Sequence, residues 1–413
     1  MTLWTGRVGA ALAPEVWEFL RAQDDELLPY DVAATLVHAR RLAHGGILTG
    51  DELAEVEKAL ARIEPPSEDD EDVHSAIERQ LGDVGRKIHA GRSRNDQVAA
   101  ALRLYVVDAC DETSDAIHSL CGTILERAEG EAETPLPGYT HLQRAVGVTV
   151  GHHLLAWVEM LERDLRRFAF ARDAAEPSPL GAGSLAGSTL ELPPPDGPQL
   201  RNSLDAVADR DFALDYLYAA ATLFVHLSRV GEELVLWSSS EFGFVRLPDD
   251  AATGSSMMPQ KLNPDVAELV RGKAGTMLGR LTALLIVVKG LPLAYDRDLQ
   301  EDKEPVFGAR RDTKLALPAL EVLVRGIVFD RGRLAAAAAD PQLRATDAAE
   351  QLVREGVPFR DAHERVGAQV RAGVFQQPPE TLPRVAPGPA DVPSAIAAAR
   401  ARLASPLSSQ IRH

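Results

Sequence analysis

The stretch TGSSMMPQKLNPD, residues 253–265, combines hydroxyl side chains, a lysine and a helix start in one short segment. Asn263 is a good N-cap, Pro264 suits the first helical turn, and apolar residues then recur at helical spacing. A helix N-terminus presents unpaired N–H groups that favour anions, and Lys261 adds a positive charge beside it. The segment therefore predicts an anion site with hydroxyls in it, although a capped helix after a flexible loop is the alternative.

Three further stretches are unusually polar for their surroundings: HAGRSRND from His89, GYTHLQRA from Gly138 and YDRDLQEDKE from Tyr295. Arginines and amides at a helix start can bind a carboxylate through two parallel hydrogen bonds. We predict that each stretch lies at an end of a long helix, with Thr140, His141 and Gln143 at a helix start. Each alone has an ordinary alternative: an N-cap with surface arginines, a structural histidine, or solvated charges. Together, three helix ends from one or several subunits are expected to meet at one cleft.

Long amphipathic patterns dominate the chain, and alternating β-branched runs are nearly absent. Such helices exceed the usual length of ~10–14 residues in globular proteins. The fold class expected is therefore all-α, with a central bundle that completes its core against other subunits. The predicted long helices cover residues 96–133, 142–175, 203–241, 264–289 and 302–327.

Composition excludes several classes of function. The 413 residues carry a formal net charge of −17, which argues against nucleic acid and anionic membranes as partners. Cys110 and Cys121 fit no zinc or redox motif, so a reduced cytoplasmic compartment is the simplest expectation. No phosphate-binding glycine loop, metal-binding motif or serine-hydrolase elbow is present, so we expect neither a metal nor another cofactor.

The chain resembles argininosuccinate lyases, within the aspartase/fumarase superfamily. GSSMMPQKLNP fits the superfamily signature GSSxMPxKxNP. The stretches AGRSRNDQV, GYTHLQRA, DAVADRDF, YDRDLQEDKE, SPLGAGSLAGST and GVPFRDAHERVG are similar to those of argininosuccinate lyases in particular. The likeness runs from Leu3 to about Val370 and covers most of the chain.

The resemblance implies a three-domain subunit, with an N-terminal domain at 1–92, a helix-bundle domain at 93–335 and a small C-terminal domain at 336–413. It also implies a cytoplasmic homotetramer whose central helices form a twenty-helix bundle, and active sites that each draw on three subunits. The implied activity is the reversible cleavage of argininosuccinate to arginine and fumarate without a cofactor. Whether the reaction would serve arginine biosynthesis, as in urea-cycle chemistry, or a specialised pathway stays open.

The resemblance also implies roles for individual residues. Ser255 would be the catalytic base and His141 the acid, although the reverse assignment is open, and Glu268 would be the carboxylate partner of His141. Lys261 and Asn263 would bind the carboxylate next to the carbon that loses its proton, where preorganised donors stabilise developing charge. The methionines after Ser255 would pack in a closed lid. The expected substrate-binding residues are Ser93, Arg94, Asn95, Thr140, Gln143, Tyr295, Gln300 and Lys303.

The sequence departs from the family pattern at a few positions. Leu20 or Arg21 stands where the family has a substrate-binding serine, and Leu262 replaces a basic residue. Ala90 and the pair Val146-Gly147 also differ from the usual residues. Two alternatives follow: a lyase acting on a different N-substituted succinate, or a catalytically silent structural relative.

Overall fold

The computed structural model of the chain describes residues 12–380, 382, 384–388 and 391–404. These residues form fifteen α-helices and three two-stranded antiparallel sheets, which confirms the all-α class. The helices are α1 (Pro14–Leu20), α2 (Leu28–His44), α3 (Gly50–Leu60), α4 (Val73–Gln80), α5 (Gly82–Ile88), α6 (Arg94–Gly130), α7 (Val150–Ala175), α8 (Ser203–Ala208), α9 (Asp211–Ser238), α10 (Asp265–Val288), α11 (Lys303–Gly326), α12 (Arg331–Ala338), α13 (Ala345–Arg354), α14 (Phe359–Arg371) and α15 (Val392–Ala404).

The short elements connect the helices. The strands are β1 (Pro135–Thr140), β2 (Gln143–Thr149), β3 (Val245–Arg246), β4 (Thr253–Gly254), β5 (Leu262–Asn263) and β6 (Val328–Phe329). They pair as β1-β2, β3-β6 and β4-β5. The 3₁₀ turns are η1 (Asp25–Leu27), η2 (Arg297–Asp302) and η3 (Pro341–Arg344). No helix in the described part of the chain is long and apolar enough to cross a membrane.

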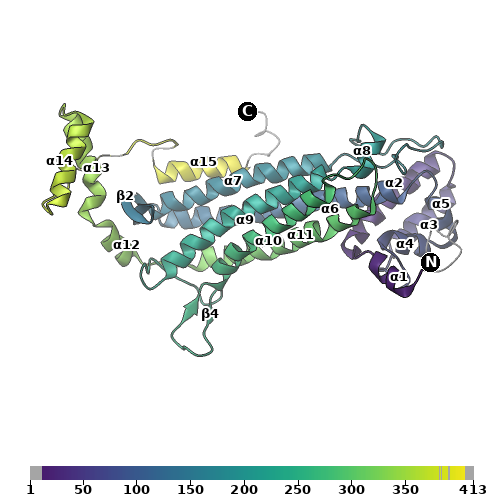
Figure 1. Ribbon diagram of the computed structural model, residues 1–413, viewed down its shortest axis with the longest axis horizontal. Coiled ribbons are helices and arrows are strands. Elements are labelled where there is room, and N and C mark those ends of the chain that lie inside the picture. Colours follow the sequence, from purple (N-terminus) through teal and green to yellow (C-terminus); the bar gives the residue numbers. More distant parts are fainter. Residues whose placement is uncertain (1–11, 381, 383, 389–390, 405–413) are drawn as a thin grey trace. The chain divides into compact units, whose positions relative to one another are not determined.

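The chain divides into two compact units. Unit 1 comprises Met1–Ser114, Arg166–Thr222 and Gly275–Lys314, and unit 2 comprises Asp115–Leu165, Leu223–Ala274 and Leu315–His413. Each of the five long helices, α6, α7, α9, α10 and α11, contributes residues to both units. These helices are labelled in Figure 1.

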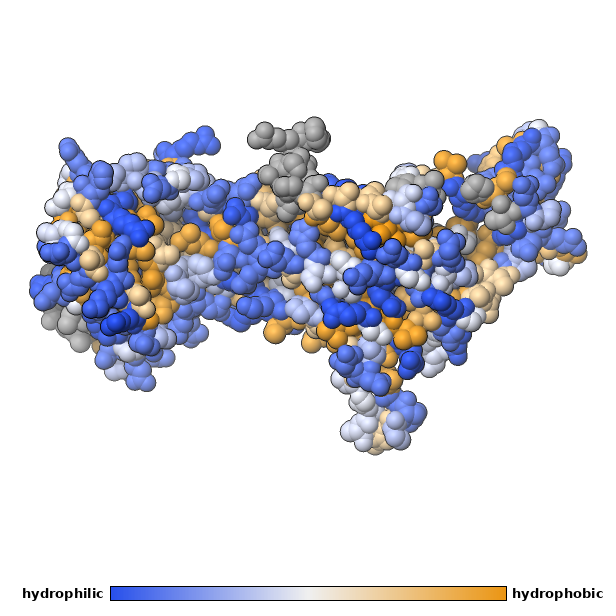
Figure 2. Space-filling view, turned by 180° about the vertical axis from the view of Figure 1, so that it is seen from behind, coloured by the Kyte–Doolittle hydropathy of each residue, from blue (hydrophilic) through white to orange (hydrophobic). Residues whose placement is uncertain are grey.

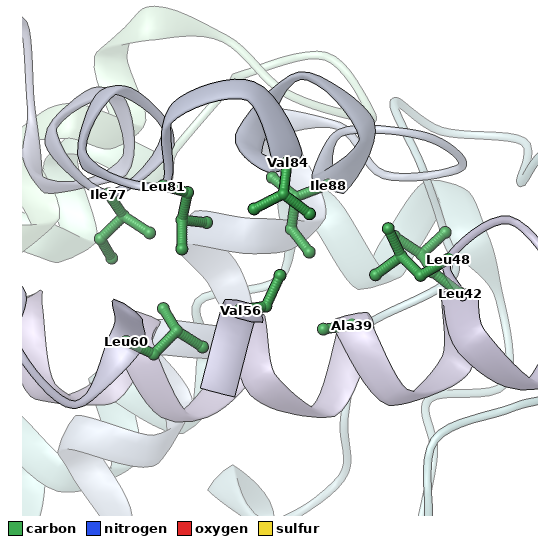
Figure 3. Close-up of a cluster of buried hydrophobic side chains, with 9 residues drawn as sticks. All are labelled: Ala39, Leu42, Leu48, Val56, Leu60, Ile77, Leu81, Val84 and Ile88. Carbon is green, nitrogen blue, oxygen red and sulfur yellow. The ribbon is translucent and has the colours of Figure 1, made fainter. Parts of the chain in front are cut away.

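In unit 1, helices α2 to α5 enclose a core of aliphatic side chains (Figure 3). Helix α3 begins with a capping box, because Thr49 accepts from the backbone N–H of Glu52 while the Glu52 carboxylate accepts from the backbone N–H of Thr49. Asp72 caps α4 in the same way, with Ser75 as its partner. The core side chains are Ala39, Leu42, Leu48, Val56, Leu60, Ile77, Leu81, Val84 and Ile88.

Side-chain contacts join the long helices to one another inside each unit. The contacts are Arg172–Asp111 between α7 and α6, Arg280–Asp312 between α10 and α11, His226–Asp164 between α9 and α7, and Arg271–Glu232 between α10 and α9. The first two lie in unit 1 and the last two in unit 2. The large side chains of Trp157, Phe168, Phe212 and Phe224 are nearly or fully buried on these helices. The long helices therefore form the bundle that the sequence predicts.

The predicted helix over 203–241 is interrupted. Helix α8 ends at Ala208 and α9 begins at Asp211. Asp209 has extended backbone angles, and its side chain accepts from the N–H of Asp211 at 2.7 Å, which caps the second helix. Arg210 turns inward and is 2% exposed. The helix is therefore interrupted because Asp209 caps a new helix and Arg210 is buried, where it bonds Asp302.

The prediction that Thr140, His141 and Gln143 lie at a helix start is wrong. They lie in the β1-β2 hairpin, where Thr140 pairs with Gln143, and α7 begins only at Val150. Pro135 and Pro137 disfavour a helix, and the Val and Thr residues of β2 favour strands. The N-cap of α7 is Thr149, whose hydroxyl accepts from the N–H of His152.

The start of α10 also differs from the prediction. Asn263 lies in β5 and pairs with Thr253 of β4, and its side-chain amide donates to the Thr253 hydroxyl at 3.4 Å. The helix begins at Asp265, whose carboxylate accepts from the same hydroxyl. A short β-ribbon therefore holds the two ends of the 253–263 loop together, and Asn263 closes this ribbon instead of capping the helix.

Candidate active site

A cavity of about 310 Å³ in unit 1 collects most of the predicted substrate-binding residues. The cavity, which we call the polar pocket, lies where the start of α6 meets the chain before α2, the start of α4 and the η2 turn. The predicted residues that line it are Ser93, Arg94, Asn95, Tyr295, Gln300 and Lys303. The segments 93–95 and 295–303, which are distant from one another in the sequence, therefore line the same cavity.

The start of α6 supplies one side of the polar pocket. Arg94 forms an ion pair with Asp72, the residue that caps α4. The hydroxyl of Ser93 accepts from the N–H of Asn95 at 3.3 Å, and the Asn95 amide donates to the backbone carbonyl of Ser184 at 3.0 Å. The three consecutive polar side chains are therefore each held by a contact of their own.

The η2 turn supplies another side. The Lys303 ammonium group lies 2.8 Å from Asp302 Oδ1, while Arg210 Nε donates to Asp302 Oδ2 at 2.5 Å. Arg210 and Asp302 are fully buried as side chains, so the pair fixes the place where Lys303 enters the pocket. Burial raises the pKa of Tyr295 above its ordinary value, and the charge of Arg297 opposes the rise. Tyr295 therefore presents a neutral hydroxyl near neutral pH.

The Leu20/Arg21 segment, where the sequence departs from the family, lies against this pocket. Ala22 lines the pocket and its N–H donates to the carbonyl of Glu71. The Leu20 carbonyl accepts from Arg297 at 2.5 Å and from the Gln300 amide at 3.4 Å. A backbone carbonyl here accepts hydrogen bonds from the η2 turn.

Sequence reasoning missed a buried histidine that lines the same pocket. His74 Nδ1 lies 2.7 Å from Asp31 Oδ2, and its Nε2 is buried without a hydrogen-bond partner among the described residues. Burial lowers the pKa of His74, but Asp31 and Asp72 outweigh burial and hold the pKa above its ordinary value. The signal that could have found it is DVH, in which the helix-capping Asp72 and the buried His74 stand on either side of the first residue of α4.

Two further titratable groups of the pocket have shifted pKa values. Burial raises the pKa of Asp24 to about 6, against the opposing charge of His74. Burial, followed by the charges of Arg92 and Arg94, lowers the pKa of His89 to about 4. Perturbed groups gathered in one cavity are typical of functional sites.

The His141 hairpin lies in unit 2 and has a strained turn. His141 and Leu142 form its two central residues, and both have φ of 56°. Such a turn normally takes Asn-Gly, since side chains other than Gly, Asn and Asp cost energy at positive φ. His141 is exposed at the tip. Backbone strain of this kind is common at functional sites.

A second cavity, of about 800 Å³, lies beside this hairpin in unit 2. Gln143, one of the predicted substrate residues, lines it together with Leu142 and Arg144. Thr140 is exposed on the hairpin. These two predicted substrate residues therefore belong to unit 2, whereas the six that line the polar pocket belong to unit 1.

The loop between β4 and β5 carries Ser255 (Figure 1). The Ser255 hydroxyl oxygen accepts from the backbone N–H groups of Met257 and Met258, at 3.3 and 3.0 Å. Both donors point at the oxygen that would carry negative charge if the serine lost its proton. Met257 is 86% exposed, so it is not packed in a lid in this conformation.

The remaining predicted catalytic residues stand on or near the same loop. Lys261 is exposed, and Glu268 lies on the first turn of α10 at 3.9 Å from Arg271. In the described part of the chain, no hydrogen bond or ion pair joins His141, Ser255 and Glu268. No group of three or more His, Cys, Asp or Glu residues there is arranged to hold a metal ion.

Comparison with known proteins identifies the class first. A family described as "Lyase" matches residues 29–279, and a C-terminal argininosuccinate lyase domain matches residues 342–381. The crystal structure of EDDS lyase in complex with formate has a TM-score of 0.78, with 25% identity over 95% of this chain and 90% of that one. The family match and the fold thus define a mainly helical lyase of the aspartase/fumarase superfamily.

Curated relatives identify the family within that class. Argininosuccinate lyase of Synechococcus sp. (strain JA-3-3Ab) is 48% identical over 395 residues, covering 90% of this chain and 81% of the relative. Argininosuccinate lyase of Frankia casuarinae is 50% identical over 388 residues, covering 89% and 84%. The chain belongs to the argininosuccinate lyase family, and it is a carbon–nitrogen lyase. The resemblance found in the sequence is confirmed.

Proposed function

We propose that this chain cleaves argininosuccinate to arginine and fumarate, and that the polar pocket binds the substrate. The observation that carries the proposal is the convergence of Ser93, Asn95 and Lys303 with three other motif residues in one cavity. Argininosuccinate bears carboxylates, an amino group and a guanidinium group. The pocket offers matching cations and hydrogen-bond donors, together with acidic groups such as Asp24 and Asp72.

Proton transfer is assigned to Ser255 and His141. Removal of a proton beside a carboxylate needs a base, and two backbone donors on the Ser255 oxygen favour its ionised form. Lys261 and Asn263 would stabilise the carboxylate that accumulates charge, by up to a few kcal/mol for one donor. His141 would protonate the departing nitrogen, with Glu268 as its partner. The mechanism needs no metal or other cofactor.

Assembly is part of the proposal, because no hydrogen bond or ion pair joins His141, Ser255 and Glu268 within the described part of one chain. His141 and Glu268 are both exposed, and the helix that begins beside Ser255 keeps a row of apolar side chains exposed. These are Leu269, Leu278, Leu285 and Ile286 of α10. Apolar patches are exposed on the face drawn in Figure 2 as well. We propose a homotetramer in which such faces are covered by other copies and each active site is shared between subunits.

The finer features of the proposal follow from the family. The three-domain division at 1–92, 93–335 and 336–413 and a cytoplasmic location are expected of a chain that makes arginine. Both cysteines are buried and form no disulfide, which suits a reducing compartment.

A second candidate is a lyase that acts on another N-substituted succinate. The observation that favours it is the Leu20/Arg21 segment, which stands where the family has a serine and places the Leu20 carbonyl in hydrogen bonds with the η2 turn. A changed contact at one point of a polar pocket is enough to alter which amino group is accepted.

The test is to incubate the purified chain with argininosuccinate, aspartate, malate and adenylosuccinate in parallel, and to follow fumarate by its ultraviolet absorbance. We expect fumarate and arginine in equal amounts from argininosuccinate, and nothing comparable from the others. Fumarate released from another succinate, with none from argininosuccinate, would favour the second candidate. No release from any of them would favour a silent structural relative.

A further inference from the structure

A buried carboxylate behind the polar pocket joins two sequence motifs that are otherwise unconnected. Asp96 stands in the first turn of α6 and is completely buried. Its Oδ1 accepts from the N–H of Ser93 at 2.9 Å. Its Oδ2 accepts from the N–H groups of Gly181 and Gly183, at 3.1 and 3.0 Å. The motif GRSRND is thereby bonded to the motif SPLGAGSLAG.

A second bond links the same two segments. The Asn95 side-chain amide donates to the Ser184 carbonyl at 3.0 Å. A carbonyl oxygen can only accept, so the nitrogen of this amide must face the loop. Ser93 is thus connected to Gly181 and Gly183 through Asp96, and Asn95 is bonded directly to Ser184.

The loop has a shape that depends on its glycines. Gly181 and Gly183 have φ of 107° and 60°, where other side chains are strained. A Cβ atom on Gly183 would lie 2.8 Å from the Gly187 carbonyl oxygen. The loop is also closed by the N–H of Gly187 donating to the Ala182 carbonyl at 2.7 Å. It is therefore a defined support for the carboxylate.

We propose that Asp96 is a positioning residue for substrate binding, and that it holds Ser93, Arg94 and Asn95 in place by fixing them to the 181–184 loop. Asp96 does not line the polar pocket, so it acts through its neighbours. A helix cap for stability alone would need only the bond to Ser93. The bonds to Gly181 and Gly183 join residues that are 85 and 87 positions apart in the sequence. Their effect is to fix the position of residues 93–95, which line the pocket. The proposal rests on the proposed function of this pocket.

The first test replaces Asp96 by Asn, which has nearly the same volume but turns one acceptor oxygen into a donor amide that opposes the backbone N–H groups. In active enzyme, KM for argininosuccinate should rise roughly tenfold to a hundredfold while kcat falls much less, because misplaced binding groups weaken binding more than they affect the Ser255 loop. Asp164→Asn is the matched control, since Asp164 is an equally buried acid in unit 2 that bonds His226. If both variants change kcat and KM alike, the positioning role is overturned.

Binding is measured separately from turnover. Calorimetry of argininosuccinate on Ser255→Ala should show the same loss of affinity when Asp96→Asn is added. If the Ser255→Ala parent binds no argininosuccinate, the proposed function fails. Asp96 is then judged by the crystal structure of Asp96→Asn, where residues 93–95 should be displaced from the 181–184 loop. An unmoved segment would overturn the proposal.

A second variant covers the case in which Asp96→Asn folds poorly. Gly183→Ala disturbs the loop from the other side of the bond. By itself, Gly183→Ala should raise KM for argininosuccinate while kcat falls much less, and an unchanged KM would overturn the proposal. Where Asp96→Asn folds, the double variant Asp96→Asn/Gly183→Ala should raise KM little more than the stronger single variant, because both changes break one link. Additive increases in KM would mean that Asp96 does not act through the loop.

Discussion

Several charged side chains of the polar pocket form ion pairs with one another or with neighbouring residues. Arg94 pairs with Asp72, Arg297 with Glu71 at 3.1 Å, and Lys303 with Asp302 at 2.8 Å. A carboxylate ligand would therefore bind to cations that already have an acidic partner. Asp24 differs, because it is almost completely buried, and in the described part of the chain its carboxylate accepts from the backbone N–H of Val73 and forms no ion pair.

Asp24 gives a prediction on stability against pH. Burial raises its pKa from 3.8 to about 6, so the folded state favours the protonated form. The stability that this proton contributes is fully present below about pH 4 and is lost as the pH rises through about 6. Asp24→Asn, which keeps an acceptor for Val73, should therefore stabilise the fold by roughly 2–3 kcal/mol at about pH 8 and by little at about pH 4.

Denaturant unfolding of both proteins at the two pH values measures this difference. An equal effect of Asp24→Asn at both values, or a loss of stability at the higher one, would show that Asp24 is not a buried acid with a raised pKa. Weaker binding of argininosuccinate by the stabilised variant would indicate that the ionised carboxylate is kept for function.

Ser255 gives a prediction on catalysis. Ser255→Ala should lower kcat by at least about a thousandfold, because removal of the proposed base would leave only binding and electrostatic stabilisation. The melting temperature should hardly change, since the residue stands on an exposed loop. Ser256→Ala, the adjacent exposed serine, is the control and should remain active. The reverse pattern of activities would move the base to Ser256.

At the scale of elements, the His141 hairpin is the feature that sequence periodicity described least well. Its register shifts between Pro137 and Tyr139, next to Gly138. A Cβ atom on Gly138 would lie 2.9 Å from the Val146 carbonyl oxygen of the opposite strand. The hairpin thus needs glycine at this irregular point to set the direction of its tip.

Gly138→Ala should lower turnover about tenfold or more, because the strands must separate and His141 moves with them. Gly147→Ala on the other strand is the control, since no atom lies within 4 Å of its Cβ position. Steady-state kinetics and circular dichroism of both variants would check the effect. Equal activity in the two variants would mean that the tip does not depend on this contact.

Helices and motif clusters could be predicted from the sequence because both leave local signals. The apolar spacing of α6, α10 and α11 gave their bounds to within a few residues, and polar stretches beside them marked the pocket. The break at Asp209 and the His141 hairpin could not be predicted, since caps and strained turns depend on tertiary contacts. His74 was missed because its significance lies in its distance to Asp31 and in its burial.

At the scale of the whole molecule, exposed apolar residues on α10 give a prediction on assembly. Ile286 is 66% exposed in a single chain, so Ile286→Asp costs little there but puts a charge into any interface that covers the helix. The variant should form smaller, inactive species by light scattering. Val374→Asp, at 65% exposure on the C-terminal part, is the control and should leave the proposed tetramer intact. A tetrameric Ile286→Asp variant would exclude α10 from the interface.

Sharing of active sites predicts that two inactive proteins restore each other. Ser255→Ala and His141→Asn should each be inactive alone. After the two are mixed, dissociated and reassembled, some mixed sites should contain an intact Ser255 from one copy and an intact His141 from another. Turnover in the mixture should then exceed that of either variant. No recovery in confirmed mixed tetramers would place both residues of a site in the same copy.

The most direct measurement of the central claim is the structure of the Ser255→Ala protein crystallised with argininosuccinate. We expect the uncleaved substrate in the polar pocket, in contact with Asn95, Tyr295 and Lys303. We also expect that His141 and residue 255, contributed by other copies of the chain, approach the bond between carbon and nitrogen. Substrate bound in the 800 Å³ cavity beside the hairpin, with the polar pocket empty, would contradict the account.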